Sequence, residues 1–360
     1  MIRVPTLFLD PIRCKKNIAK MAAKARRNNV AFRPHVKTHQ SLAVARWLKE
    51  EGVSKITVSS LKMAAYFAQE WNDITVAFPT NILEIETINS LASKIQLNLC
   101  VENVEVLEFL EKHLKSPVGI FLKMDIGYNR TGIAVDRFSI IDQLLNQMEQ
   151  TPLLQFKGFL GHAGHSYQCR SKEAIEAVHQ ESKEKILMLK DRYQKQYPEL
   201  ILSYGDTPSC SVSEDFAGID EIRPGNFTFY DLTQNIIGSN ELNEIAVAMA
   251  CPVVAKHPDR NEIVVYGGGV HLSKDRVEDP EDGVIFGRVA EQKGASWGAC
   301  IPKMHLKSLS QEHGIVSVPK EKMQDYAIGD LLWVLPVHSC MAADLMKEFH
   351  TTDGAILSAM

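Results

Sequence analysis

The sequence has no large excess of charge of either sign and no long apolar run. Forty basic side chains stand against 44 acidic ones, a formal net charge of −4. We therefore expect no nucleic-acid partner, which would require a basic patch or stripe. The longest apolar run, 245–255, has 11 residues and contains Pro252, whereas a membrane span needs about 20. We predict no membrane contact and interpret this run as one or two buried strands.

Cysteine is scarce and scattered. The seven cysteines are odd in number and include no Cys-x-x-Cys pair, a pattern that favours reduced thiols over a disulfide framework. The first residues also lack an apolar stretch followed by a small-residue cleavage site, so no secretory signal is expected. The sequence therefore predicts a cytoplasmic protein.

The composition is that of a folded, globular chain. Hydrophobic residues make up 45% and charged residues 23% of the sequence, close to the soluble average. A disordered chain would combine low hydrophobicity with high net charge, and is excluded. The length of 360 residues is enough for two domains.

The first part of the chain, to about residue 230, repeats one unit: a short apolar or β-branched run followed by a longer segment with helical spacing. The predicted strands are 30–34, 55–59, 74–78, 95–100, 118–124, 154–160, 200–204 and 221–224. Helices are predicted between them, including one over about 103–114 and one over about 171–193. This alternation predicts an α/β fold, a (β/α)8 barrel of the TIM type, with an open doubly wound sheet as the alternative.

The pattern changes after about residue 240. Short alternating strands are predicted at 262–266, 283–290, 314–318 and 331–337, with a β turn at 267–269 and a helix only near 341–349. Turn residues separate the strands, as is typical of β-rich domains. We therefore predict a barrel domain at 1–240 and a β-rich domain at 241–360.

The segment Arg33-Pro-His35-Val-Lys37-Thr-His39 follows the first predicted strand. If that strand continues, the side chains of His35, Lys37 and His39 share one face, at the strand ends where barrels place their active sites. A lysine between two imidazoles in a dry or cationic site loses its proton more readily, and a neutral amine can form a Schiff base with an aldehyde. The alternative is a solvated surface lysine.

Two glycine-containing segments follow the fifth and sixth strands. Asp125-Ile-Gly-Tyr-Asn-Arg130-Thr-Gly132 places a permanent positive charge after a strand, where it can hold an oxyanion. Its alternative is a turn with a structural Asp–Arg pair. Gly161-His-Ala-Gly-His165-Ser-Tyr167 follows the next strand, and its glycines permit close backbone approach. His165 is equally suited to a structural role in the loop.

Two more segments follow the last predicted strands, Gly205-Asp-Thr207-Pro-Ser209 and Arg223-Pro-Gly225-Asn226. Barrels frequently bind phosphate in these two loops, through backbone amides and hydroxyls. Thr207, Gly225 and Asn226 are the candidates. Ordinary turns have similar sequences, so the prediction depends on the position of the two segments in the barrel.

A histidine and a cysteine lie two residues apart in Pro336-Val-His338-Ser-Cys340. In a strand such a pair lies on one face, and an imidazole and a thiolate both suit Zn²⁺. A closed structural site would need four protein ligands. Two ligands leave positions open for water or substrate, as catalytic metal sites require; the alternative is a coincidence of sequence.

Together these motifs resemble those of the D-serine dehydratase and D-threonine aldolase group, fold-type III pyridoxal-phosphate enzymes with an alanine-racemase-like barrel. The resemblance covers nearly the whole chain and implies that Lys37 binds the cofactor. It places Arg130 near the cofactor's phenolic oxygen, Tyr167 beside its pyridine ring and its phosphate at Thr207, Gly225 and Asn226. We also expect His35 to be one of the cofactor-binding residues.

The resemblance also assigns the metal. His-x-Cys is the pair of the dehydratase type, whereas the aldolase type usually has His-x-Asp, so His338 and Cys340 are expected to bind Zn²⁺ or another divalent ion. Gln40 stands where many relatives have a lysine, and we expect only a peripheral contact to change. Glu312-His313 resembles a segment facing the site, with no role assigned. The family forms homodimers, and residues 1–8 are expected to join the second domain.

The implied function is a lyase on a small 3-hydroxy-D-amino acid. Lys37 takes the Cα proton, the metal helps the β-hydroxyl to leave, and the product is a 2-oxo acid plus ammonia. Three alternatives remain: a retro-aldol lyase of the D-threonine aldolase type, an amino-acid racemase, and a non-catalytic pyridoxal-phosphate-binding protein. The sequence does not identify the substrate's side chain.

Overall fold

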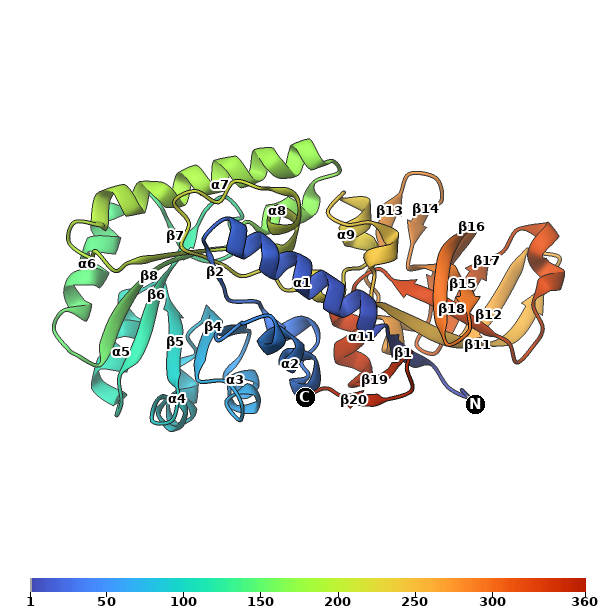
Figure 1. The fold of residues 1–360 in the computed structure, drawn as a ribbon, viewed down its shortest axis with the longest axis horizontal. Coiled ribbons are helices and arrows are strands. Elements are labelled where there is room, and N and C mark those ends of the chain that lie inside the picture. Colours follow the sequence, from blue (N-terminus) through green and yellow to red (C-terminus); the bar gives the residue numbers. More distant parts are fainter. Residues whose placement is uncertain (1) are drawn as a thin grey trace. The chain divides into compact units, whose positions relative to one another are not determined.

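The computed structural model describes residues 2–360, which form two compact units (Figure 1). The first, here called the barrel unit, comprises residues 20–37 and 45–225. The second, the β unit, comprises residues up to 19, residues 38–44 and residues 226–360. Each unit has its own nine-stranded sheet.

The barrel unit is built on parallel strands. Their order is β2 (Ala31–Phe32), β10 (Glu221–Ile222), β9 (Ile201–Tyr204), β8 (Leu154–Gly161), β6 (Val118–Asp125), β5 (Gln96–Val101), β4 (Asp73–Pro79) and β3 (Ile56–Val58), with the short β7 (Ile133–Ala134) beside β6. An isolated parallel bridge from His35 to Thr57 joins the two ends of this order. The prediction of a (β/α)8 barrel is confirmed, and each of the eight predicted strands is present.

Helices alternate with these strands along the chain. They are α1 (Pro11–Arg27), α2 (Leu42–Glu50), α3 (Leu61–Phe67), α4 (Ile85–Ala92), α5 (Val104–His113), α6 (Phe138–Met148), α7 (Lys172–Tyr193) and α8 (Thr207–Val212). The two helices predicted individually, α5 and α7, are confirmed. The side chains of Asn103 and Ser171 cap them by accepting the backbone N–H three residues on, which satisfies a donor that the first helical turn leaves free.

The β unit contains a mostly antiparallel sheet. Its order is β12 (Glu262–Tyr266), β17 (His313–Ser317), β16 (Ser296–Leu309), β15 (Gly287–Lys293), β18 (Leu331–Pro336), β11 (Val247–His257), β1 (Thr6–Leu9), β19 (Glu348–Thr351) and β20 (Ile356–Ser358). A further pairing of β12 with β11 closes part of this sheet on itself. The long apolar run in the sequence is therefore mostly β11, a strand that pairs on both sides.

Two strands of this unit differ from the sequence prediction. The strand predicted at 283–290 is two strands, because the chain changes partners: β14 (Gly283–Ile285) pairs with β13 (Val277–Asp279), while β15 pairs with β16 and β18. The long strand β16 was not predicted. Its alternation is interrupted by Lys303, which has a left-handed φ of 61°, and by shifts of register against its neighbours.

The glycines 267–269 do not form the predicted β turn. They lead from β12 into the short helix α10 (Gly269–Leu272). A Cβ at Gly268 would collide with the carbonyl of Gln311, so this position has no room for a side chain. The other helices here are α9 (Leu232–Ile236) and α11 (Ser339–Met346). Within residues 2–360, no helix combines the length and apolarity needed to cross a membrane.

Candidate active site

The segment that carries Lys37 is a turn, not a continued strand. The 3-10 helix η1 (Val36–Thr38) begins directly after His35, so the predicted alternation of His35, Lys37 and His39 on one face is wrong. The side chain of Lys37 is exposed, whereas His39 is fully buried. His35 remains beside Lys37, because its ring Nδ1 accepts the backbone N–H of Lys37 at 3.4 Å.

His39 is buried and is held by contacts within the protein. Its Nδ1 accepts the backbone N–H of Ser41 at 3.1 Å, and its ring lies edge-on to Phe229 at 6.4 Å between centroids. Burial lowers the pKa of His39 to about 3, although the bond from Ser41 opposes this shift. The ring is therefore neutral at physiological pH and contributes no charge beside Lys37.

Positive charge gathers around His162, which follows the last residue of β8. The ring donates from Nδ1 to the carbonyl of Gly205 at 2.7 Å. Burial, followed by the charges of Lys123, Lys37 and Arg130, lowers the pKa of His162 well below 6.5, against the effect of the Gly205 bond. Three cations thus act on one neutral imidazole, and an anionic group placed among them would be stabilised.

Arg130 is exposed, and its guanidinium lies over the ring of Tyr128 at 4.9 Å. Tyr128 also lies edge-on to His162 and stacks on His165, with centroid distances of 5.8 and 6.4 Å. The motifs that follow the fifth and sixth predicted strands are therefore in contact. Sequence reasoning considered His165 but missed His162, whose only signal was its position directly after a strand.

Lys123 was also missed. It lies within β6, its side chain is 4% exposed, and its Nζ donates to the carbonyl of Met124 at 3.3 Å. The pKa of Lys123 is lowered to about 8, chiefly by burial; the charges of Arg223 and Arg130 act in the same direction, and those of Cys100 and Glu102 oppose it. A charged residue inside an otherwise apolar strand was the available signal, since lysine is rarely buried without a reason.

The loop that carries Tyr167 is fixed to the next loop along the barrel. Tyr167 lies half-buried in the 3-10 helix η3 (Gly164–Gln168). Its neighbour Ser166 donates to Asp206 Oδ1 at 2.8 Å, and the same oxygen accepts the backbone N–H of Ser209 at 2.7 Å to cap α8. Burial raises the pKa of Asp206 to about 6, against these hydrogen bonds, which lower it.

Two of the predicted phosphate-loop residues are in contact. The backbone N–H of Gly225 donates to the Thr207 hydroxyl at 3.2 Å, and Thr207 is 1% exposed. These residues come from the loops after β10 and β9, so the structure joins the two loops as their position at the strand ends implied.

Asn226, in the β unit, has different partners. Its amide Nδ2 donates to Asp231 Oδ2 at 2.6 Å, to Ser339 Oγ at 3.2 Å and to Cys340 Sγ at 3.4 Å. Its Oδ1 is buried and has no hydrogen-bond partner among residues 2–360. The Asn226 side chain therefore supports the thiol of Cys340.

The prediction assumed that His338 and Cys340 lie in a strand, and the structure shows that they do not. The chain leaves β18 at Pro336, His338 is the residue before α11, and Cys340 lies in the first turn of that helix. The sulfur of Cys340 lies 3.2 Å from the hydroxyl of Thr38 and 3.4 Å from the amide of Asn226. Both groups can donate to a thiolate, which would favour the charged form that binds metal.

The imidazole of His338 lies between acidic groups. Its Nδ1 is 2.6 Å from Asp275 Oδ2. Burial alone lowers the pKa of His338, but the hydrogen bond and charge of Cys340, the charge of Asp231 and the bond to Asp275 raise it to about 10. Among residues 2–360, no group of three or more histidine, cysteine or carboxylate side chains is arranged to hold a metal. A metal on this pair would therefore keep open coordination positions.

The remaining candidates lie in the β unit as well. Glu312 approaches His271 at 3.8 Å between Oε2 and Nε2, and no site role follows from this contact. Gln40 donates through Nε2 to Asp344 at 2.8 Å. All seven cysteines are free thiols.

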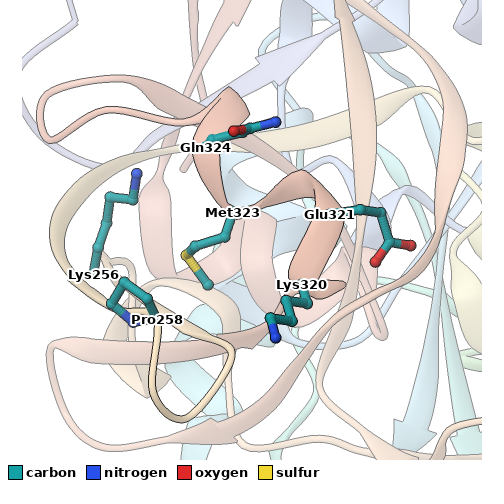
Figure 2. Close-up of a pocket in the computed structure, with 6 residues that line it drawn as sticks. All are labelled: Lys256, Pro258, Lys320, Glu321, Met323 and Gln324. Atoms are coloured by element: carbon teal, nitrogen blue, oxygen red, sulfur yellow. The ribbon is translucent and has the colours of Figure 1, made fainter.

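A separate pocket of about 710 Å³ lies in the β unit, between the end of β11 and the 3-10 helix η6 (Lys320–Asp325) (Figure 2). It is lined by Lys256, Pro258, Lys320, Glu321, Met323 and Gln324. None of these is a predicted site residue, and the lining contains neither a histidine nor a cysteine. The chemistry-bearing residues therefore gather elsewhere, at the strand ends of the barrel unit and around α11.

Comparison with known proteins identifies both parts of the chain. Residues 9–232 match the family model of the alanine racemase N-terminal domain, and residues 246–352 match that of a putative serine dehydratase domain. A D-serine dehydratase of Dictyostelium discoideum is 29% identical, over 97% of this chain and 92% of the relative. A D-threonine aldolase of an Arthrobacter species is 23% identical, over 99% of this chain and 89% of the relative.

Among solved structures, D-threo-3-hydroxyaspartate dehydratase from Delftia sp. HT23 superposes with a TM-score of 0.92. Sequence identity is 24%, and the match covers 100% of this chain and 98% of that one. Two further structures of a D-threo-3-hydroxyaspartate dehydratase carry a cysteine-to-alanine and a histidine-to-alanine substitution, two positions apart in sequence. The cysteine mutant is described as being in the metal-free form.

Proposed function

Because the chain belongs to the family of the alanine racemase N-terminal domain, we propose that it is a pyridoxal-phosphate- and metal-dependent lyase that removes water from a small 3-hydroxy-D-amino acid. One observation carries the proposal. The two groups that contact the Cys340 sulfur, Thr38 and Asn226, directly follow Lys37 and Gly225 in the chain. The metal pair is thus supported by the chain neighbours of two predicted cofactor residues.

The residues of the barrel unit fit pyridoxal phosphate. Its phosphate and phenolic oxygens are anionic, and the charges of Lys37, Lys123 and Arg130 already act together at His162. Thr207 and the Gly225 backbone would hold the phosphate, and Arg130 would hold the phenolic oxygen. Lys37 would bind the aldehyde carbon, while Tyr167 and His35 would contact the ring. When bound, the cofactor supplies an electron sink for the charge left by loss of the Cα proton.

The chain's own groups have distinct tasks in this proposal. The amine of Lys37 takes the proton from Cα, since it is exposed and is the group released when the substrate amine binds. The neutral ring of His162 adds no further positive charge among the cations. The η3 segment, fixed through Ser166 and Asp206, holds Tyr167 in a defined position.

The residues around α11 fit a divalent metal, and we propose Zn²⁺. Cys340 would supply a thiolate and His338 the ring Nε2, because its Nδ1 is occupied by Asp275. Two protein ligands leave positions for the substrate, and the metal would supply Lewis-acid assistance to departure of the β-hydroxyl. The histidine and cysteine substitutions in the D-threo-3-hydroxyaspartate dehydratase structures, the cysteine mutant being in the metal-free form, support the same pair here.

Elimination is favoured over retro-aldol cleavage by Cys340 itself, because the aldolase type usually has an aspartate at this position. The proposal also includes the cytoplasm as the compartment, on the pattern of scattered free cysteines. A homodimer is proposed as the assembly, on the family resemblance.

A product screen tests the function. The protein, supplied with pyridoxal phosphate and Zn²⁺, is incubated with D-serine, D-threonine and 3-hydroxy-D-aspartate. We expect a 2-oxo acid and ammonia from at least one of them, and no product from the Lys37→Ala variant. Glycine plus an aldehyde would replace the proposal with an aldolase. Racemised substrate, or bound cofactor without turnover, would rule out a lyase.

A further inference from the structure

Asp275 reaches the metal pair from a distant part of the sequence. It lies between α10 and β13, 63 residues before His338. Ser273 ends α10 with a left-handed φ of 68°, and its hydroxyl accepts the backbone N–H of Asp275 at 3.1 Å. This turn directs the carboxylate of Asp275 toward the imidazole.

The contact fixes the state of the His338 ring. In this contact a carboxylate oxygen accepts and a ring N–H donates, so Nδ1 of His338 carries the hydrogen that it shares with Asp275 Oδ2 at 2.6 Å. The other nitrogen, Nε2, is then the one that can bind a metal. The side chains of His338 and Asp275 are 40% and 50% exposed, so water competes with Asp275 for the ring nitrogen.

We infer that Asp275 is a positioning residue for the metal site. It holds His338 in the tautomer and ring orientation that present Nε2 to the same ion as the Cys340 sulfur. Metal-binding histidines commonly donate their second nitrogen to a carboxylate in this way, and loss of that partner weakens metal binding by about 10–100-fold. The inference rests on the proposed function and adds a residue that neither the motifs nor the comparisons assign.

The test uses Co²⁺ as the probe, because Co²⁺ bound to a thiolate has a charge-transfer band in the near ultraviolet, measured as a difference from the metal-free protein. The cofactor-loaded protein is stripped of metal by a chelator and titrated with Co²⁺. We expect Asp275→Ala to weaken binding by about 10–100-fold, and the band to persist at saturating Co²⁺ because Cys340 is still present. Asp275→Asn should recover much of the affinity, since its amide oxygen can accept the same bond.

Controls separate this inference from the proposal that supports it. Glu278→Ala removes an exposed carboxylate three residues further on and should bind Co²⁺ like the wild type, while Cys340→Ala should lose the band. Thermal unfolding shows whether each variant is folded. Wild-type protein that binds no Co²⁺ would overturn the metal site and this inference together. Two results would overturn only the inference, provided that the wild type binds Co²⁺. One is an affinity of Asp275→Ala within twofold of the wild type, and the other is an affinity of Asp275→Asn no higher than that of Asp275→Ala.

Discussion

At the scale of the residue, burial separates the two lysines of the candidate cofactor site. Lys37 is exposed, and its amine is accessible to an aldehyde. Lys123 is buried in β6, where burial lowers its pKa to about 8. The first is suited to covalent chemistry with a cofactor. The second contributes charge to the cationic surroundings of His162 at a cost in stability.

The accessibility of Lys37 predicts where the cofactor attaches. Pyridoxal phosphate should add an absorption band to the protein, and reduction with borohydride should fix the cofactor on Lys37. Peptide mapping by mass spectrometry identifies the modified lysine. An adduct on Lys123 or elsewhere, or none after cofactor has been supplied, would contradict the assignment.

Burial of Lys123 predicts a pH-dependent stability. Its folded pKa, about 8, lies below its ordinary value of 10.5, so between these pH values the unfolded chain binds more protons and stability rises with pH. At pH 7 the charged form costs up to about 3 kcal/mol, from roughly 1.4 kcal/mol per pKa unit. Lys123→Met should therefore raise the free energy of unfolding at pH 7, and its advantage should shrink as the pH rises toward 10.5.

Urea denaturation at pH 7 and pH 9 measures this difference. Lys62→Met is the matched control, because Lys62 is an exposed lysine on α3 and its replacement should have no pH-dependent effect. A Lys123→Met protein whose advantage is equal at both pH values would show that burial of the charge is not the cause.

At the scale of the element, the site is assembled from the turns that follow strands. The short helix η1 begins directly after the isolated bridge at His35, and Lys37 within it is exposed. The loops after β9 and β10 are joined by the bond from Gly225 to Thr207, and η3 is joined to α8 through Asp206. Each loop is thus held by its neighbour, so a change in one should be transmitted to the next.

The joined loops predict a hydroxyl-dependent cofactor site. Thr207→Val keeps the shape of the side chain but removes the acceptor of the Gly225 N–H, and a lost buried hydrogen bond costs about 1–3 kcal/mol. We expect a lower midpoint of unfolding and cofactor binding weakened by about tenfold or more, because one tenfold step corresponds to about 1.4 kcal/mol. Equilibrium dialysis with pyridoxal phosphate measures the second effect. Thr207→Ser, which keeps the hydroxyl, should bind nearly normally; a similar loss in both variants would count against the role of the hydroxyl.

At the scale of the whole molecule, distant segments supply the metal pair and its supports. Thr38, Asn226, Asp231 and Asp275 surround His338 and Cys340. None of these supports is near the pair in sequence. The predicted metal chemistry therefore depends on the β unit being folded, whereas Lys37, Thr207 and Gly225 belong to the barrel unit.

This division predicts that removing the metal separates two steps of the reaction. A chelator should abolish release of the 2-oxo acid, because hydroxide leaves poorly without a Lewis acid. The cofactor should stay bound, because Lys37, Thr207 and Gly225 belong to the barrel unit and do not depend on the metal. Exchange of the Cα proton with deuterated solvent should continue. Mass spectrometry of the recovered substrate, measured alongside 2-oxo acid release, compares the two steps. Full elimination activity in metal-free protein would show that the reaction does not need a metal.

The sequence by itself determined the succession of elements. Periodicity of apolar residues located the eight barrel strands and helices α5 and α7, because strand and helix spacing are local properties. Motifs after the strands located Lys37, Arg130 and Tyr167 along the chain, and parallel strands bring such positions to one end of a barrel. The contact of Gly225 with Thr207 follows from the same rule.

Only the tertiary structure decided what surrounds each of these residues. The turn η1 separated Lys37 from His39, Lys123 proved to be buried, and Asn226 contacted a cysteine more than a hundred residues away. No motif or spacing in the sequence pointed to Asp275. Burial and long-range hydrogen bonds depend on how distant segments pack, and no local spacing encodes that packing.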